Sequence, residues 1–262
     1  MASNTLSMTL VQPHMAWEDK DANLTHLSSL IKAAPGPHEV VVLPEMFATG
    51  FSMAPERQAE HMDGPTIAWM RDTAKTQRII LCGSVIIDEG GHFYNRFVWM
   101  QPDGQYYTYD KRHLFGYANE DAHYTAGERK LIVQVKGWKI CPLVCYDLRF
   151  PVWARHTAGA EYDVLLYVAN WPQRRSLAWK ALLQARAIEN QSYAIGVNRV
   201  GEDGNSIAYS GDSSVFGPLG ECLVQLSEGE AVRTIVLQKD TVDDARSHFP
   251  FLKDGDRFVI SG

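Results

Sequence analysis

Three reactive side chains each come directly after an apolar run of the chain. Glu45 ends V-V-V-L-P-E, Lys111 ends Y-Y-T-Y-D-K and Cys145 ends I-C-P-L-V-C. In α/β proteins, ligands bind at the carboxyl ends of strands, because loops and helix N-termini meet there. A carboxylate, an ammonium and a thiol at one such edge provide a base, a positive charge and a nucleophile. The pattern therefore indicates covalent catalysis by the thiol of Cys145.

Each of these residues also has a simpler interpretation. Free cysteine is among the most buried residue types, so a cysteine at a strand end is more often an inert part of the core. That interpretation fits Cys82, Cys141 and Cys222, and it would fit Cys145 if that residue stood alone. A lone glutamate or lysine would likewise be a helix cap or a solvated surface charge. The coincidence of the three strand ends favours the catalytic interpretation.

Other cysteine chemistry has less support. His113 and His123 flank the lysine, but no cysteine-protease signature accompanies them, which disfavours a cysteine–histidine pair. The four cysteines are too few and too scattered for a disulfide framework, and in a reducing compartment they should be free thiols. No C-x-x-C or H-E-x-x-H pattern occurs, so no metal site is expected.

Size and composition favour one large α/β domain. Of the 262 residues, 45% are hydrophobic and 21% are charged, as is ordinary for a globular protein. We expect the domain over residues 1–240 and a tail over residues 241–262 that packs on it or on a partner subunit. No apolar run approaches the ~20 residues of a membrane helix, and the first residues lack the pattern of a secretory signal. A cytoplasmic location without membrane association follows.

The charge pattern argues against a nucleic-acid partner. The formal net charge is -6, and no basic run is longer than the pair Arg174–Arg175. A polyanion-binding protein needs a positively charged face, which this composition does not indicate. A small molecule is therefore the expected ligand.

Strand-like and helix-like patterns alternate as an α/β fold requires. Turn sequences at 102–105, 201–205 and 217–221 predict hairpins, so the sheets should mix parallel and antiparallel neighbours. Four helices are expected, over residues 21–34, 65–77 and 176–190 and from near Phe150. On the helix expected over residues 176–190, one row along the surface is formed by Leu177, Ala181, Gln184 and Ile188. Eleven strands are expected: 6–12, 39–44, 78–87, 93–100, 106–109, 131–135, 139–145, 164–169, 193–198, 212–216 and 232–237.

Considered together, the three motifs resemble those of the nitrilase superfamily of carbon–nitrogen hydrolases, which carry a Glu-Lys-Cys triad. L-P-E-M-F-A-T-G-F (43–51) is similar to the glutamate motif, Y-D-K-R-H-L-F (109–115) to the lysine motif and V-C-Y-D-L-R-F-P (144–151) to the cysteine elbow. A-N-W-P (169–172) resembles a fourth signature of the superfamily. The resemblance continues to about residue 240 and so covers most of the chain.

The resemblance implies a fold and an activity. The fold is a four-layer α-β-β-α sandwich, usually paired as a homodimer, and no cofactor is implied. H-L-F after the lysine and N-W-P after the elbow are most like the omega-amidase branch. Its members hydrolyse the terminal amide of a small dicarboxylate monoamide, such as a 2-oxo acid derived from glutamine or asparagine. The substrates are then this amide and water.

Other functions stay open at this point. A nitrilase or a carbamoyl-amine hydrolase would carry the same triad and differ only in its pocket. A non-catalytic, redox-responsive relative would use the thiol merely as an oxidisable group. Turnover of candidate amides separates these alternatives.

The superfamily triad implies a role for each group. Cys145 would attack the amide carbonyl, while Glu45 takes the thiol proton, passes it to departing ammonia and then activates water. Lys111 and the backbone N–H of Tyr146 would donate to the oxyanion. Glu120 occupies the place of a second glutamate near the lysine and would keep Lys111 charged or position the substrate.

The proton transfer from thiol to carboxylate is unfavourable for free side chains. Cysteine titrates near ~8.5 and glutamate near ~4.3, a gap of roughly 4 units or about 6 kcal/mol. We expect the site to narrow this gap by burying Glu45 and by placing Lys111 and a helix N-terminus beside Cys145. The residues after the elbow, Y-D-L-R-F-P-V-W-A-R, are expected to form that helix.

A substrate carboxylate needs a cation in the pocket. Arg174 or Arg175, just after N-W-P, is the expected partner, because arginine binds carboxylates with two parallel hydrogen bonds. Asp147 and Arg149 are expected to be structural, either as an ion pair or by holding the elbow. The expected pocket walls are the aromatic residues Phe115, Tyr117 and Trp171.

Overall fold

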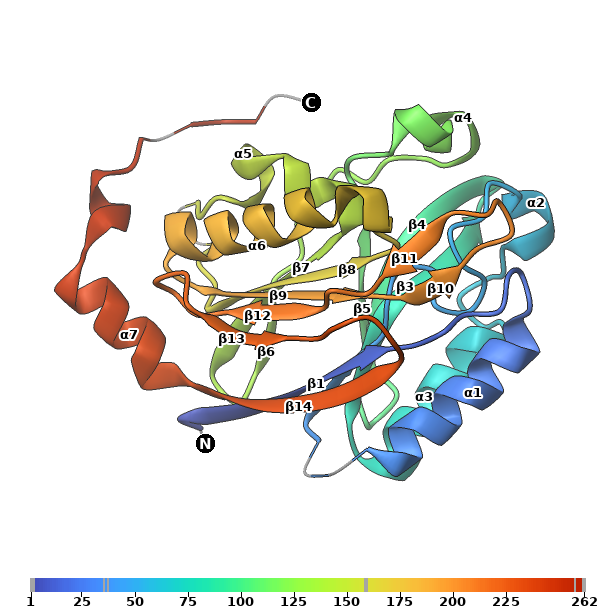
Figure 1. Ribbon diagram of the computed structural model, residues 1–262, viewed down its shortest axis with the longest axis horizontal. Helices are drawn as coiled ribbons and strands as arrows, with labels where there is room; N and C mark the ends of the chain where they lie inside the picture. The colour runs from blue at the N-terminus through green and yellow to red at the C-terminus, as the bar shows by residue number, and fades with distance from the viewer. Residues whose placement is uncertain (1–2, 35, 37, 158–159, 257, 261–262) are drawn as a thin grey trace.

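Two six-stranded sheets form the centre of the molecule in a computed structural model that describes residues 3–34, 36, 38–157, 160–256 and 258–260 (Figure 1). The first sheet has the order β14 (Ala231–Gln238), β1 (Thr5–Gln12), β2 (Val40–Val42), β3 (Ile80–Glu89), β4 (His92–Met100) and β5 (Tyr106–Asp110). The second has the order β13 (Cys222–Gln225), β12 (Ser214–Phe216), β9 (Tyr193–Asn198), β8 (Val164–Ala169), β7 (Trp138–Val144) and β6 (Val133–Val135). A two-stranded ribbon joins β10 (Val200–Glu202) to β11 (Ala208–Ser210).

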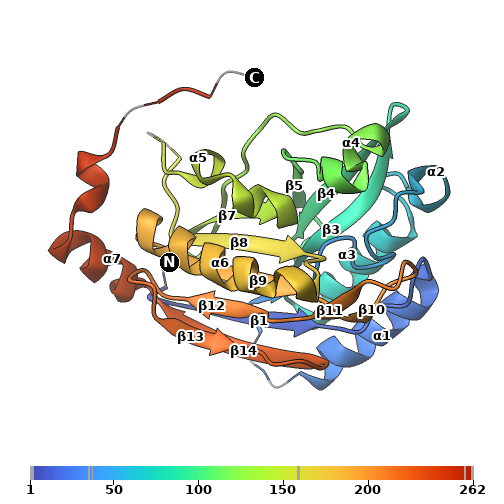
Figure 2. The same ribbon diagram turned by 45° about the horizontal axis from the view of Figure 1, so that its top comes forward.

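Helices cover the outer face of each sheet. α1 (Lys20–Ala33) and α3 (Pro65–Gln77) lie on the first sheet, and α6 (Ser176–Asn190) lies across β8 and β9 of the second (Figure 2). This arrangement confirms the expected four-layer α-β-β-α sandwich. The shorter helical segments are α2 (Pro55–Gln58), η1 (Gly116–Ala118), α4 (Glu120–His123), η2 (Cys145–Arg149), α5 (Pro151–Ala154), η3 (Gln173–Arg175), α7 (Lys239–His248) and η4 (Phe251–Asp254).

Successive side chains of a strand point to opposite faces of its sheet, so each strand packs against the layer on either side. In β2, Val40 and Val42 face the second sheet, and Val41 faces α1 and α3. Both faces of the strand are therefore buried, which explains its uninterrupted apolar sequence. The core between the two sheets brings Trp99 of β4 together with Ile140 of β7.

α6 has the expected length but buries a different face from the row noted in the sequence. Leu177 is 81% exposed and Ile188 is 50% exposed. The buried side instead carries Trp179 and Leu183, whose rings and methyl groups pack against β9. A row at this spacing marks one side of a helix but does not say which side faces the core.

All eleven expected strands are present, and the structure adds β10, β11 and β13 among the residues it describes. The three additional strands have three or four residues each, too few to show a clear alternation. The expected strand at 212–216 begins only at Ser214, because Asp212 has a positive φ of 55° that ordinary strand residues do not adopt. The three predicted hairpins connect antiparallel pairs, and β7, β8 and β9 are parallel.

The C-terminal segment begins with α7, whose Val242 and Ala245 are buried against the domain. The guanidinium of Arg246 donates to the backbone oxygens of Tyr162 (2.7 Å) and Gln191 (2.9 Å). The boundary at residue 240 stays a prediction, and residues 257, 261 and 262 of the expected tail lie outside the described residues. Within the described part of the chain, no helix combines the length and the apolar character needed to cross a membrane.

Candidate active site

A cavity of about 220 Å³ opens where the strand ends that carry Lys111 and Cys145 meet. Lys111 follows β5 in the first sheet, and Cys145 follows β7 in the second. The cavity therefore lies at the edge between the two sheets. Its lining residues are Phe51, Met53, Lys111, Phe115, Tyr117, Ala118, Cys145, Tyr146, Arg149, Asn170, Trp171, Pro172, Arg174, Arg175, Asp203, Asn205, Ile207 and Tyr209.

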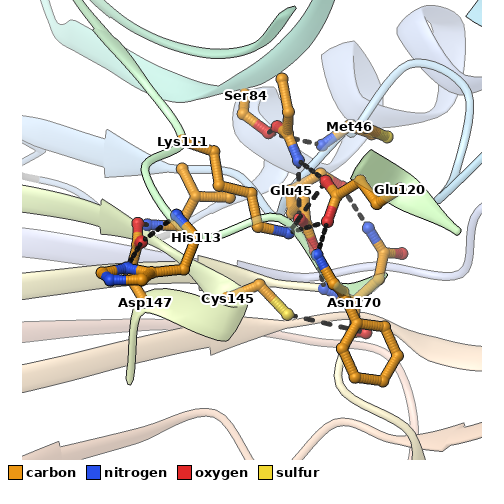
Figure 3. A network of polar contacts seen from close by, with 12 residues as sticks. Glu45, Met46, Ser84, Lys111, His113, Glu120, Cys145, Asp147 and Asn170 are labelled. Carbon is orange, nitrogen blue, oxygen red and sulfur yellow. Dashed lines mark hydrogen bonds and ion pairs between the residues drawn. The ribbon is translucent and has the colours of Figure 1, made fainter. Parts of the chain in front are cut away.

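The structure brings all ten predicted site residues to this place. Eight of them line the cavity, and Glu45 and Glu120 lie directly behind Lys111. Figure 3 shows the end of the Lys111 side chain beside Glu45 and Glu120, with the sulfur of Cys145 below it. The Lys111 Nζ donates to Glu45 Oε1 at 2.9 Å and lies 3.0 and 2.9 Å from the two oxygens of Glu120. All three side chains are fully buried.

Two asparagines also donate hydrogen bonds to the carboxylates of Glu45 and Glu120, and neither was predicted from the sequence as a site residue. Asn95 Nδ2 donates to Glu45 Oε1 at 2.8 Å and to Glu120 Oε1 at 3.2 Å. Asn170 donates its backbone N–H to Glu45 Oε2 at 2.8 Å. Ser84 fixes the orientation of Asn95 by donating to its Oδ1 at 2.8 Å. The only hint of Asn95 in the sequence is a polar residue in the middle of the apolar run F-Y-N-R-F.

The buried charges shift each other's pKa values. Burial alone lowers the pKa of Lys111, but the carboxylates of Glu120 and Glu45 more than offset it, so the pKa is raised above its ordinary value. The lysine is therefore an ammonium at neutral pH. Burial also raises the pKa of Glu120, with a smaller contribution from Glu45, although Lys111 acts in the opposite direction.

Cys145 sits on a sharp turn with a positive φ of 43°, which side chains with a Cβ rarely adopt. Such a strained backbone persists only where contacts with the surrounding structure hold it in place, as they often do at active sites. The sulfur lies 4.0 Å from the backbone oxygen of Asn170. Burial raises the pKa of the Cys145 thiol, Glu45 and Glu120 raise it further, and Lys111 lowers it.

This pKa differs from the lowered value expected from the sequence. The expected helix after the elbow is only the five-residue 3₁₀ turn η2 followed by the four-residue α5. Pro151 causes the interruption, because it pushes the preceding Phe150 out of the helical region, to φ -111° and ψ 88°. Burial and the two carboxylates thus favour the protonated thiol over the thiolate.

The expected ion pair between Asp147 and Arg149 is absent from the described structure. Asp147 is buried and instead accepts hydrogen bonds from Tyr109 Oη (2.7 Å) and His113 Nδ1 (2.7 Å). His113 stacks on Phe150 with ring centroids 3.8 Å apart, so its ring is engaged in holding the elbow rather than in activating the thiol. Arg149 turns to the cavity.

Three arginines line one side of the cavity. The guanidinium of Arg149 lies 5.0 Å from the ring centroid of Trp171, and that of Arg175 lies 5.1 Å from the ring centroid of Phe115. Burial lowers the pKa of Arg175, and the neighbouring positive charges of Arg174 and Arg149 lower it further. Among the described residues none of the three arginines has a carboxylate partner. The group is therefore arranged to receive an anion.

Asp203 also lines the cavity, and both of its carboxylate oxygens already accept hydrogen bonds. Its Oδ1 accepts the backbone N–H groups of Asn205 (2.8 Å) and Ile207 (3.0 Å), and its Oδ2 accepts the hydroxyl of Tyr209 (2.9 Å). These bonds shape the loop between β10 and β11 into one wall of the cavity. Tyr117 lies at the opening and is 79% exposed. No group of three or more potential metal ligands occurs in the described part of the chain.

A family model described as "Carbon-nitrogen hydrolase" matches residues 7–247. The chain belongs to the carbon-nitrogen hydrolase family. It is 44% identical over 256 residues to Omega-amidase YafV of Escherichia coli K12, covering 97% of this chain and 98% of that relative. It is 29% identical over 251 residues to the 2-oxoglutaramate amidase of Bacillus subtilis strain 168, covering 95% and 96% of the two chains.

Solved structures agree with this membership of the carbon-nitrogen hydrolase family. XC1258 from Xanthomonas campestris, a CN-hydrolase superfamily protein with an arsenic adduct in its active site, has a TM-score of 0.95 and 43% identity. The similarity covers 99% of this chain and 100% of that one. Nit3 of Saccharomyces cerevisiae has a TM-score of 0.84 at 25% identity, over 95% and 96% of the two chains. The resemblance stated from the motifs is confirmed.

Proposed function

We propose that this carbon-nitrogen hydrolase is an omega-amidase that hydrolyses the terminal amide of a small dicarboxylate monoamide, of the 2-oxoglutaramate or 2-oxosuccinamate type. One observation carries the proposal: Cys145 and Lys111 share a cavity with three arginines that have no carboxylate partner among the described residues. The substrate amide would lie at the sulfur and its distal carboxylate at the arginines. The omega-amidase and 2-oxoglutaramate amidase relatives support this substrate class.

In the first step the sulfur of Cys145 attacks the amide carbonyl and the thiol proton moves to Glu45. Each carboxylate oxygen has about two lone-pair positions. Glu45 Oε1 already accepts from Lys111 and Asn95, whereas among the described residues Oε2 accepts one hydrogen bond, from the backbone N–H of Asn170. Oε2 is thus the oxygen with room for the proton.

The tetrahedral intermediate carries a negative oxygen that needs donors. An ammonium has three N–H donors, and the Nζ of Lys111 lies within hydrogen-bonding distance of Glu45 Oε1 and of both oxygens of Glu120. In the proposed mechanism the two Glu120 oxygens share one of these donors, which leaves one N–H for the oxyanion. The backbone N–H of Tyr146, the residue after the nucleophile, is the proposed second donor.

Glu45 then returns the proton to the amide nitrogen, the carbon–nitrogen bond breaks and ammonia leaves. The acyl group stays on Cys145 as a thioester. Glu45 next removes a proton from water, which attacks the thioester carbonyl, and the acid departs as the thiol is restored. The net reaction converts the amide and water to the acid and ammonia. Glu120 is proposed to hold the Lys111 ammonium in place throughout.

The proposed carboxylate partners are Arg149, Arg174 and Arg175. We expect each arginine-to-alanine variant to raise KM about ten- to hundredfold for an acidic omega-amide, because a charge-assisted hydrogen bond of roughly 1.5–3 kcal/mol is lost. Ammonia release from a panel of acidic and neutral amides of equal length, a nitrile and a carbamoyl amine measures this effect. The wild type should favour the acidic omega-amides.

The neutral amide is the control within that panel. Its KM should change less than about threefold in the arginine variants, since it has no carboxylate to lose. Equal effects on acidic and neutral amides would refute binding of the substrate carboxylate by these arginines. Wild-type preference for the nitrile or the carbamoyl amine would replace the omega-amidase proposal by the corresponding hydrolase of the same family.

We also propose a homodimer formed through α6. Gln184 Nε2 donates to Gly220 O at 2.8 Å, which joins α6 and the β12–β13 turn into one surface. Its exposed apolar side chains are Leu177 (81%), Leu219 (55%), Ile188 (50%) and Leu223 (44%). An apolar patch of this kind marks an interaction site in soluble proteins.

Replacing Leu177 and Ile188 by glutamate is expected to convert the dimer to a monomer, because charged groups cannot enter a dry apolar interface without a large free-energy cost. Sedimentation equilibrium measures the change. The control is Val236→Glu on β14, a 50% exposed position on the other sheet, which should leave the mass unchanged. A monomeric wild type would refute the dimer.

A cytoplasmic location remains part of the proposal. The four cysteines are free thiols in the structure, as is usual for proteins of a reducing compartment. Cell fractionation tests this location, and recovery of the protein outside the cytoplasm would contradict it.

A further inference from the structure

Asp147 is a fully buried carboxylate in the elbow turn, two residues after Cys145. It accepts four hydrogen bonds. Oδ2 accepts from the hydroxyl of Tyr109 (2.7 Å) and the backbone N–H of Val144 (2.9 Å). Oδ1 accepts from the backbone N–H (3.0 Å) and from Nδ1 (2.7 Å) of His113. These donors fill the four lone-pair positions of the carboxylate.

Three of the four donors belong to the lysine segment of the chain. Tyr109 and His113 stand two residues before and two residues after Lys111. The fourth donor, Val144, stands directly before Cys145. One carboxylate therefore connects residues on both sides of the lysine, through the Tyr109 hydroxyl and through the backbone and ring of His113, to the turn that carries the sulfur.

The surroundings hold this connection in one arrangement. The Tyr109 hydroxyl also accepts from Trp153 Nε1 (3.0 Å) and from the backbone N–H of Arg112 (3.2 Å). Burial and the negative charge of Asp147 raise the pKa of Tyr109, so the hydroxyl keeps the proton that it donates. The ring of His113 lies flat on Phe150, at an interplanar angle of 8°.

Lys111 follows a strand of the first sheet and Cys145 follows a strand of the second. The position of the ammonium relative to the sulfur thus depends on how the two sheets meet at this edge. We propose that Asp147 is a positioning residue of the amide hydrolysis, which sets the Lys111 ammonium against the acyl group on Cys145. It acts through these two residues without touching the substrate, and the inference rests on the proposed function.

Asp147→Asn tests this inference, because the amide turns one acceptor oxygen into a donor that faces two donors. A displacement of about 1 Å costs about 100-fold in rate. We expect kcat for an acidic omega-amide to fall about 100-fold while KM changes less than about twofold, since the binding groups are untouched. Tyr109→Phe keeps the carboxylate and removes one of its donors, so kcat should fall about tenfold at unchanged KM.

Asp163→Asn is the matched control. Asp163 is also a buried carboxylate that accepts a backbone N–H, from Lys139 at 2.9 Å, but it lies at the opposite end of β7 and pairs with Lys239 and Arg246. This variant should lower the melting temperature and keep the wild-type kcat. The comparison separates loss of stability from loss of alignment.

The outcomes are distinct. Wild-type kcat in folded Asp147→Asn would overturn the inference, as would an equal loss of kcat in Asp163→Asn at a similar shift in melting temperature. If Asp147→Asn does not fold, Tyr109→Phe decides, and an unchanged kcat in that variant overturns the inference. Failure of the wild type to release ammonia in the same assay would instead refute the proposed function.

Discussion

Replacing Cys145 by alanine is expected to lower kcat for an acidic omega-amide by at least about four orders of magnitude, because removal of a catalytic nucleophile has effects of that size or larger. Without the sulfur no thioester forms, and Lys111 and Glu45 are left to assist direct attack by water. Amide nitrogen is a poor leaving group, so that route is slow. Ammonia release at saturating substrate measures the loss.

Cys222→Ala is the control for this variant. Cys222 is an exposed free thiol on β13, away from the cavity, so its removal should leave kcat unchanged. The melting temperature of Cys145→Ala should stay near that of the wild type, since the position is only partly buried. More than about 1% of wild-type kcat in Cys145→Ala would contradict covalent catalysis by this residue.

Lys111→Met is expected to abolish turnover and to lower the free energy of unfolding by about 3–5 kcal/mol, the usual cost of leaving buried charges without their partner. The lysine is fully buried between Glu45 and Glu120. Its loss removes the oxyanion donor and the positive charge that balances both carboxylates. Denaturant unfolding measures the second effect, and ammonia release measures the first.

The defect of Lys111→Met should depend on pH with a definite sign. Burial already raises the pKa of Glu120, and Lys111 is the group that holds it down, so its pKa rises further in the variant. A carboxyl with a folded-state pKa above its unfolded value stabilises the fold at low pH and loses that contribution as pH rises through the folded pKa. The variant should therefore recover stability relative to wild type as the pH falls toward about 4.

Adding Glu120→Gln to Lys111→Met provides the control. The neutral pair should restore part of the free energy of unfolding at pH 7 without restoring turnover, because one buried negative charge is gone but the oxyanion donor is still missing. Turnover in either variant above about 1% of wild type would contradict the role proposed for Lys111.

The strand ends of Glu45 and Cys145 were predictable because the apolar runs before them are almost completely buried and stop at a functional residue. β5 before Lys111 is exposed at Tyr106 and Tyr107, so its end was predicted from its β-prone residues and from the lysine motif. Other strands were predictable from similar apolar runs, since β1, β2, β8 and β9 have almost no exposed residues. A strand that is buried on both faces needs an unbroken apolar sequence, and such a run can be recognised without knowing which distant residues it contacts. The four-layer arrangement was implied by the resemblance to the family. The family motifs then placed the remaining site residues.

Features that depend on tertiary contacts were not predictable in this way. Nothing local shows that Asn95, in the middle of β4, donates to two carboxylates from other parts of the chain. Asp147 and Arg149 were expected to form an ion pair or to hold the elbow. Asp147 holds the elbow through donors from residues near Lys111, whereas Arg149 lines the cavity. The exposed row on α6 likewise depends on which side meets β9.

The direction of the Cys145 pKa is the most informative of these differences. The sequence favoured a thiolate stabilised by a helix N-terminus, whereas Pro151 interrupts the expected helix after the five-residue η2, and burial together with the two carboxylates raises the pKa of the thiol. In the proposed mechanism Glu45 therefore accepts the thiol proton during attack.

The most direct test of covalent catalysis is rapid-quench mass spectrometry of the wild type while it turns over an acidic omega-amide. We expect a transient adduct on the peptide that contains Cys145, with the mass of the substrate less ammonia, formed as ammonia is released. Release of ammonia with no adduct at any time, or with the acyl group on another residue, would contradict covalent catalysis by Cys145.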